Sequence, residues 1–327
     1  MIVSNRALGL LRTLGAVMLA GSLLASCGGS TSQLDAFSPS RLVVLGDETS
    51  LLRTDGAKYS VNAIDTADAD ADGNVTEVLC SSKLIWVQSL ANYFGLVFDG
   101  CKSSTSTATA TALNQAAYGA GVAETEAQLK AFNDNIAHDS LGDKDLVTVL
   151  VGLHDIRNVY LDGNYATEAQ RSAEIAARAK RVAAMVNSIV SKGSKVLVST
   201  APDIGLSPWA LGLGSSEAAE ISRHVSTFNT NLRLGLENDG SKIGLLLFDD
   251  LVRAAVSLPG TYGFSDVSSL ACVDGHRETL LYTCTTATLA ATGADTAYLW
   301  ADGFHVGSTM QSYLGSQAVT RATNNPF

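Results

Sequence analysis

The sequence predicts an α/β fold in three layers, with helices on both sides of a central, mostly parallel sheet. Short apolar runs rich in Val, Leu and Ile alternate with longer segments of helical periodicity, a pattern that indicates crossover connections between parallel strands. Polar or glycine residues follow the apolar runs directly, as expected where a strand ends in a tight turn. Because ligands of such sheets bind at the carboxyl ends of the strands, these following residues are the first candidates for a functional site.

Apolar runs predict four strands, at residues 41–45, 146–151, 195–199 and 243–248. Their carboxyl ends are marked by Asp47, Gly152, Pro202 and Asp249. Helices are predicted at residues 84–94, 124–137, 168–191, 216–236 and 308–321. The helix at 168–191 has the clearest pattern, because its apolar residues fall on one face and Gly193 follows its end. The long polar stretches 65–77 and 261–296 are interpreted as insertions.

The first residues are interpreted as a targeting segment. Arg6 and Arg12 precede a short apolar run at 13–24, which ends in Leu24-Ala25-Ser26-Cys27. Small residues before a cysteine resemble a lipobox, which implies cleavage before Cys27 and lipidation of its thiol. An ordinary secretory signal with a cysteine nearby is the alternative. We therefore expect a lipoprotein signal peptide at 1–26, a tether at 27–40 rich in Ser, Thr and Gly, and a single domain at 41–327.

These features favour a lipid-anchored protein of the cell envelope, with the membrane as a partner through Cys27. Gly28 follows the cysteine, where an Asp often retains bacterial lipoproteins at the inner membrane, so the outer membrane is expected. The composition, 46% hydrophobic and 17% charged, suits one domain with a full core. The net charge of −10 and the lack of a basic cluster argue against nucleic acid as a partner.

Four cysteines remain beyond Cys27, an even number that favours disulfides in an exported protein. Three pairings are possible, and proximity in the sequence favours Cys80–Cys101 and Cys272–Cys284. Free, buried cysteines are the alternative. The spacing does not suggest structural zinc.

Several short motifs follow the predicted strands in a fixed order. The first is Gly46-Asp47-Glu48, and the segment Gln115 to Ala120, which contains Gly119, comes next. Gly152-Leu153-His154-Asp155 and a Pro202-to-Pro208 turn follow, and Asp302-Gly303-Phe304-His305 is the last. Together they resemble the motifs of the SGNH/GDSL ester hydrolases, in which Gly-Asp-Ser carries the nucleophile. The resemblance covers about residues 41–322 and implies a flavodoxin-like three-layer sandwich.

The resemblance implies a role for each matching residue. His305 corresponds to the general base and Asp302 to the residue that orients it, while the backbone N–H at Gly119 helps to stabilise the oxyanion. Glu48, however, stands where the family has its serine, and His154 stands where it has an asparagine. Thr49 and Ser50 are near, but a shift along a sharp turn points a side chain elsewhere. Ester hydrolysis is the activity that the resemblance implies, and serine-type catalysis is expected to be weak or absent.

Three interpretations of Glu48 remain open. It forms an ion-pair network with His305 and His154 in a site that has lost its catalysis, or its carboxylate attacks an alkyl carbon and a water activated by His305 opens the resulting ester. In the third, Glu48, His154 and His305 bind zinc or non-haem iron, with Asp302 supporting His305. No cofactor is expected from the family. The alternative to an esterase is a non-catalytic envelope lipoprotein that binds a ligand or metal through the altered pocket.

A second metal candidate lies in the polar stretch. Asp68, Asp70 and Asp72 alternate before Gly73, as at the start of a calcium-binding loop. The acid expected at the twelfth position is replaced by Leu79, so a solvated acidic loop is the alternative. The other histidines, His138, His224 and His276, belong to no motif and are interpreted as surface or loop residues.

Overall fold

A computed structural model describes residues 37–64, 77–102, 106–135 and 140–324. Five parallel strands form its central sheet in the order β2-β1-β3-β4-β5. These are β1 (Arg41–Gly46), β2 (Ala112–Asn114), β3 (Asp145–Leu150), β4 (Lys195–Ser199) and β5 (Ile243–Leu246). The predicted parallel sheet is confirmed, and the four predicted strands are present with small differences at their ends. The short β2 was not predicted.

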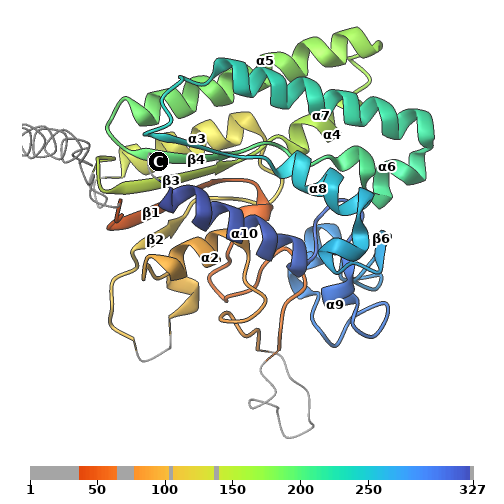
Figure 1. Ribbon diagram of the computed structural model, residues 1–327, viewed down its shortest axis with the longest axis horizontal. Coiled ribbons are helices and arrows are strands. Elements are labelled where there is room, and N and C mark those ends of the chain that lie inside the picture. Colours follow the sequence, from red (N-terminus) through yellow and green to blue (C-terminus); the bar gives the residue numbers. More distant parts are fainter. Residues whose placement is uncertain (1–36, 65–76, 103–105, 136–139, 325–327) are drawn as a thin grey trace, which may run out of the picture. The chain divides into compact units, whose positions relative to one another are not determined.

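Helices cover both faces of the sheet, as the three-layer prediction requires (Figure 1). One face carries α3 (Val122–Asp134), α4 (Leu153–Leu161), α5 (Glu168–Val190), α6 (Pro208–Leu213) and α7 (Ser215–Gly235). The other carries α2 (Trp86–Tyr93), α8 (Phe248–Ser257) and α10 (Ser308–Thr323). The predicted helices are all present, whereas α4, α6 and α8 were not predicted.

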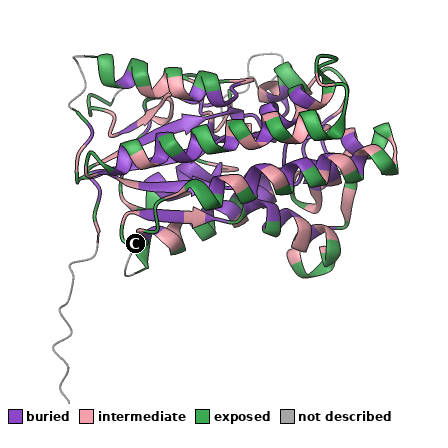
Figure 2. Cartoon of the chain, turned by 90° about the horizontal axis from the view of Figure 1, so that it is seen from above, coloured by how far each residue is buried: buried purple, intermediate pink, exposed green. Residues whose placement is uncertain are grey.

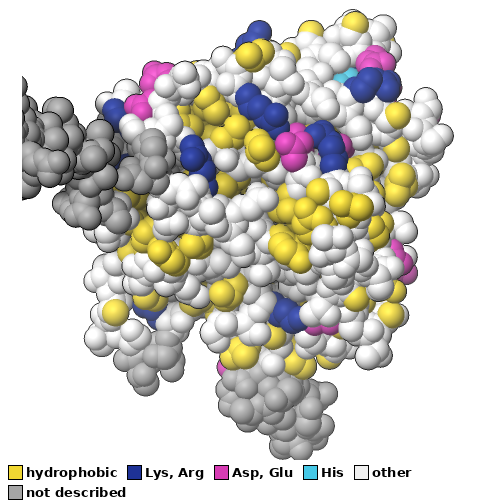
Figure 3. All heavy atoms as spheres, in the orientation of Figure 1, with side chains coloured by type: hydrophobic (Ala, Val, Ile, Leu, Met, Phe, Trp, Pro, Cys, Tyr) yellow, Lys and Arg dark blue, Asp and Glu magenta, His cyan; other side chains and the backbone are white. Residues whose placement is uncertain are grey.

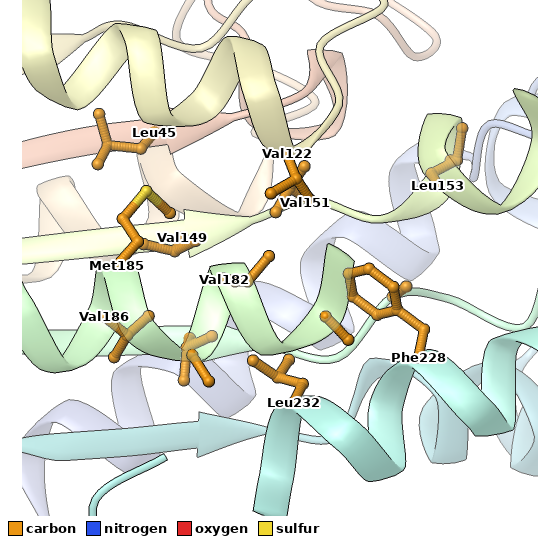
Figure 4. Close-up of a cluster of buried hydrophobic side chains, with 14 of the residues drawn as sticks. Leu45, Val122, Val149, Val151, Leu153, Val182, Met185, Val186, Phe228 and Leu232 are labelled. Carbon is orange, nitrogen blue, oxygen red and sulfur yellow. The ribbon is translucent and has the colours of Figure 1, made fainter. Parts of the chain in front are cut away.

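The strands are buried on both faces because each layer of helices covers one set of alternating side chains. Val43 and Leu45 of β1 point into the cluster that contains α5 and α7, while Leu42 and Val44 point into the cluster on the opposite face. Figure 4 shows part of the first cluster, where Val149 of β3 lies among side chains of α5 and α7. The helices show exposed outer faces and buried inner faces around the sheet (Figure 2).

The long helix α5 illustrates how the sequence sets an element's ends. The side chain of Thr167 accepts a hydrogen bond from the backbone N–H of Gln170, and Gln170 reaches back to Thr167 to complete a capping box. Its buried residues, which run from Ile175 to Val190, pack mainly against the sheet and α7. Gly193, just beyond the helix, has a φ of 101°, a conformation that glycine adopts at low cost.

A smaller structure is built from the polar stretch before the last helix. The strands β6 (Asp266–Leu270) and β7 (Tyr298–Trp300) form a two-stranded parallel sheet, and the short α9 (Ala294–Ala297) precedes β7. The Cys272–Cys284 disulfide closes a loop in this region, and Cys80–Cys101 closes another before β2. Both predicted pairings are confirmed. Short 3-10 helices are η1 (Glu48–Ser50), η3 (Asp99–Cys101), η4 (Ile204–Leu206), η5 (Pro259–Tyr262) and η6 (Glu278–Thr283).

Two glycines shape the carboxyl edge of the sheet. Gly46 at the end of β1 has a φ of 129°, and a Cβ there would lie 1.9 Å from the carbonyl oxygen of Leu150. Gly152, after β3, has a φ of 127°, and a Cβ there would lie 2.7 Å from the ring of Phe228. Any larger residue would therefore push apart the turns that carry the candidate site.

Some predictions fall on residues that the structure does not describe. These are the signal peptide and Cys27, most of the tether, and the acidic loop with Asp68, Asp70 and Asp72. Within the described ranges, no helix is both long enough and apolar enough to cross a bilayer.

Candidate active site

The candidate site lies where η1, the turn before α3, the first turn of α4 and the loop before α10 meet. Glu48 begins η1, two residues after the end of β1 at Gly46. The side chain of Asp47, which lies between them, caps this turn by accepting a hydrogen bond of 2.9 Å from the backbone N–H of Thr49. His154 lies in the first turn of α4, after β3, and His305 lies shortly before α10. The structure thus brings together three residues that the sequence motifs placed at strand ends or near the last helix.

The Glu48 carboxylate is the centre of this site and is fully buried. Its Oε1 lies 2.6 Å from Nε2 of His154 and 2.5 Å from Nε2 of His305. Its Oε2 accepts a hydrogen bond of 2.9 Å from the backbone N–H of Gly119. Both oxygens are therefore used, as a buried carboxylate requires.

Asp302 holds His305 from the opposite side of the imidazole. Both carboxylate oxygens lie 2.9 Å from Nδ1 of His305, and Oδ1 also accepts hydrogen bonds from the backbone N–H groups of Phe304 and His305. Oδ2 accepts a further hydrogen bond of 2.8 Å from the backbone N–H of Glu278. These bonds fix Asp302 and with it the plane of the His305 ring.

The two ring nitrogens of His305 both face carboxylate oxygens, so both must carry hydrogen and the ring is an imidazolium. Burial alone would lower the pKa of His305, but the charges and hydrogen bonds of Asp302 and Glu48 raise it to about 10. Burial would raise the pKa of Glu48, but the hydrogen bonds and charges of His154 and His305 hold it well below its ordinary value. The site therefore contains a buried ion pair at neutral pH.

Asp47 sits beside this ion pair with one oxygen unpartnered. Its side chain is fully buried, and Oδ2 has no hydrogen-bond partner among the described residues. Burial and then the charge of Glu48 raise the pKa of Asp47 to about 7. A second full negative charge next to Glu48 is thus disfavoured.

The hydroxyls of Ser50 and Thr49 are not hydrogen-bonded to the histidines of the site within the described residues. Oγ of Ser50 accepts a hydrogen bond of 3.0 Å from the indole N–H of Trp86, and Ser50 is fully buried. Neither Ser50 nor Thr49 forms a side-chain hydrogen bond with a histidine within the described part of the chain. A nucleophilic hydroxyl needs a hydrogen bond to its general base. The geometry therefore favours neither Ser50 nor Thr49 as the nucleophile.

Two residues that were not among the predicted site residues support the site. The backbone of Glu278, with a φ of 51°, points its N–H at Asp302, although it lies in the stretch interpreted as an insertion. Asp155 accepts hydrogen bonds from the backbone N–H of Val122 and thereby holds the start of α3. Val122 lies three residues after Gly119, whose N–H donates to Glu48. Asp155 had a signal, because it completes the motif that begins at Gly152, whereas Glu278 had none.

The interpretation of the remaining histidines is wrong for His224. This residue lies in α7 and is fully buried, with its Nε2 3.0 Å from Glu220 and its Nδ1 3.4 Å from the hydroxyl of Ser172 on α5. Helix α7 faces α5, so a polar residue on that face becomes an interhelical contact. His276 is partly buried in a loop, as expected, and His138 lies outside the described residues.

Glu48, His154 and His305 also meet the geometric requirement for a metal site. One ligand atom from each lies within 4.8 Å of the others, and all three residues are buried. The set of two imidazoles and a carboxylate is one that zinc accepts. Asp302 on Nδ1 of His305 is the partner that a metal-binding histidine commonly has.

The fold and the order of these residues agree with a known class of proteins. The family model for GDSL-like lipase/acylhydrolase matches residues 43–318, and the chain belongs to this family. A search of curated proteins found no match. Among solved structures, the chain is similar to an extracellular lipase from Streptomyces rimosus, at 16% identity and a TM-score of 0.44, covering 87% of this chain and 100% of that one. It is also similar to the YxiM protein of Bacillus subtilis, at 14% identity and a TM-score of 0.37, covering 86% of this chain and 56% of that one.

Proposed function

We propose that this protein keeps the GDSL fold without serine-type ester hydrolysis, and that it serves as a ligand-binding lipoprotein of the cell envelope. The observation that carries the proposal is the environment of Glu48. Its carboxylate takes the hydrogen bond of the base His305 and that of the Gly119 N–H, the groups that an esterase would offer to its serine and to the oxyanion.

The same contacts argue against ester hydrolysis by neighbouring groups. Oγ of Ser50 accepts a hydrogen bond from the indole N–H of Trp86, and Ser50 forms no hydrogen bond with His305. A carboxylate nucleophile would need an oxygen free to approach carbon, whereas both oxygens of Glu48 accept hydrogen bonds and the side chain is fully buried. The interpretation that fits best is a catalytic site converted into an internal ion-pair network.

The test is hydrolysis of p-nitrophenyl acetate and butyrate by the mature domain. The wild-type protein should remain at the rate of the uncatalysed reaction. Glu48→Ser restores a hydroxyl at the end of β1 and should raise hydrolysis above that rate, and His305→Ala in the same protein should remove the gain. Wild-type turnover that is lost in Ser50→Ala or Thr49→Ala would contradict the proposal.

The envelope part of the proposal rests on the sequence before the domain. Leu24-Ala25-Ser26 precedes Cys27 at the end of an apolar run, and cleavage there would leave a lipid-modified cysteine joined to the domain by a short polar tether. In a Gram-negative host the full chain should fractionate with outer membranes, and Cys27→Ser should release it from them. Equal membrane association of the wild-type protein and Cys27→Ser would contradict a lipid anchor at Cys27.

A divalent metal site is the second candidate function, favoured by the close approach of Glu48, His154 and His305. Zinc would take the Nε2 atoms of both histidines in neutral form and would replace the hydrogen bonds to Glu48. Calorimetric titration of zinc into chelator-treated domain separates the two candidates. Tight binding that His154→Ala and Glu48→Gln both remove would favour the metal site, and the absence of binding would leave the ion-pair network.

A further inference from the structure

We infer that Arg157 binds the carboxylate or phosphate group of a small aromatic ligand, at a surface adjoining the Glu48 site. The inference rests on the proposed binding function and names the chemical class of the ligand. Arg157 lies on α4 three residues after His154, so the two side chains share one side of the helix.

The hydrogen-bonding groups of Arg157 are unused within the described part of the chain. Its side chain forms no hydrogen bond or ion pair there, and its Nε is buried without an acceptor. Other arginines are paired with carboxylates, as Arg171 is with Glu220 and Arg223 is with Glu168. On the face drawn in Figure 3, several basic side chains likewise lie next to acidic ones. Because Arg157 is only partly buried, a ligand at the surface can supply acceptors to its terminal N–H groups, while its Nε stays buried without an acceptor.

Aromatic rings hold this guanidinium in place. Its central carbon lies 4.9 Å from the ring centroid of Phe304 and 5.4 Å from that of Trp209. Tyr160 lies edge-on to Trp209, with 6.3 Å between ring centroids. The backbone N–H of Trp209 also donates a hydrogen bond of 2.8 Å to Gly303. The rings therefore orient the flat guanidinium without using any of its N–H groups.

The same rings connect Arg157 to the buried network. Phe304 is next to His305 in the sequence, and its ring lies 4.2 Å from the ring of His305 and 6.1 Å from that of His154, measured between centroids. Arg157 and Trp209 are only partly buried, while Glu48 and His305 are inaccessible. A ligand can therefore reach the arginine and its rings while the Glu48 site stays closed.

The chemistry of these groups specifies the ligand. A guanidinium offers parallel N–H groups that fit the two oxygens of a carboxylate or phosphate. The partly exposed ring of Trp209 provides an apolar surface against which a flat ring can stack. Benzoate and phenyl phosphate carry both features, and benzamide is a neutral ligand of the same shape as benzoate.

Indole N–H signals in NMR spectra of the mature domain provide the test. Trp86 and Trp300 are fully buried, with their indole N–H groups bonded to Ser50 and Val267, so a surface ligand should shift the signal of Trp209 alone. Titration with benzoate or phenyl phosphate should give a saturable shift of that signal, and benzamide should bind at least about tenfold more weakly. The Trp209→Phe variant assigns the signal.

The matched variants are Arg157→Gln and Arg223→Gln. They remove the same charge from an arginine that has no acidic partner among the described residues and from one that is paired with Glu168. Arg157→Gln should weaken anion binding at least about tenfold, equivalent to about 1.4 kcal/mol or more, and Arg223→Gln should leave it unchanged. Preference for only one of the two anions identifies the source of the oxyanion and supports the inference. Equal binding by wild type and Arg157→Gln, equal binding of benzamide, or no saturable shift would overturn it. Esterase assays do not enter this result, so it can fail while the proposed loss of serine catalysis stands.

Discussion

Replacing Glu48 by Gln tests the buried ion pair without changing the size of the side chain. The carboxylate accepts hydrogen bonds from three donors, His154, His305 and the Gly119 N–H. An amide has one oxygen and one N–H₂ group, so at least one of these donors must face another donor. The His305 imidazolium also loses one of its two negative partners while it stays buried.

The expected loss of stability follows from these contacts. Removing one partner of a buried pair typically costs about 3–5 kcal/mol, because the other charge stays buried without compensation. Glu174→Gln is the matched control, since Glu174 pairs with Arg178 in a partly exposed position, with 32% of its side chain accessible. Exposed pairs of this kind contribute about 0–1 kcal/mol. Glu48→Gln should therefore lower the free energy of unfolding by several times as much as Glu174→Gln.

Urea unfolding of the mature domain at pH 6.5, followed by circular dichroism with the disulfides intact, measures both effects. The structure of each folded variant is checked by its near-ultraviolet spectrum. If Glu48→Gln and Glu174→Gln cost the same within about 1 kcal/mol, the ion pair at the centre of the site would contribute little, and the reasoning from its burial would be refuted.

Three further predictions follow from the same structure. Because the pKa of His305 is raised from 6.5 to about 10, its stabilising effect is complete below pH 6.5 and is lost as the pH rises through about 10; urea unfolding across this range should show falling stability, and a flat profile would contradict the ion pair. Replacing Cys80 and Cys101 together by Ser opens a loop of 21 residues and should cost about 2–4 kcal/mol in urea unfolding, whereas an unchanged midpoint would argue that the bridge constrains little. Gly152→Ala should lower the thermal unfolding midpoint, because the added Cβ clashes with Phe228 and because the φ of 127° is unfavourable for alanine. In the control Gly163→Ala the added Cβ meets no atom within 4 Å, so the midpoint should be nearly unchanged. Equal midpoints of the two variants would refute this account of the turn at Gly152.

Much of the fold could be predicted because parallel strands buried on both faces have a simple sequence pattern. The strands β1, β3 and β4 are continuous apolar runs, and each was located to within a residue or two at either end. The strand β5 was predicted two residues too long, because Phe248 is apolar but begins α8 and packs into the core from there. The strand β2 has only three residues in a stretch rich in Thr and Ala, so it lacks a pattern of its own.

The meeting of Glu48, His154 and His305 could also be predicted from the sequence. Glu48 and His154 come shortly after neighbouring parallel strands, whose carboxyl ends share one edge of the sheet. The place of His305 beside them was implied by the resemblance to the GDSL family. The hydrogen bonds that Asp302 and Glu48 accept from the backbone N–H groups of Glu278 and Gly119 could not be predicted. The direction of a backbone N–H group depends on the local chain conformation, which the residue type at these positions does not specify. His224 was misplaced for a similar reason, since its burial is set by the packing of α7 on α5.

Labelling of the mature domain with a fluorophosphonate probe tests the central claim most directly. Such a probe reacts with an activated serine or threonine hydroxyl and forms a stable adduct that peptide mass mapping can locate. Because Glu48 takes the hydrogen bonds of His305 and Gly119, and Ser50 is bonded to Trp86, the wild-type domain should remain unlabelled under conditions that fully label an active serine esterase. Stoichiometric labelling at Ser50 or Thr49 would contradict the account, because it would show that the protein retains an activated hydroxyl nucleophile.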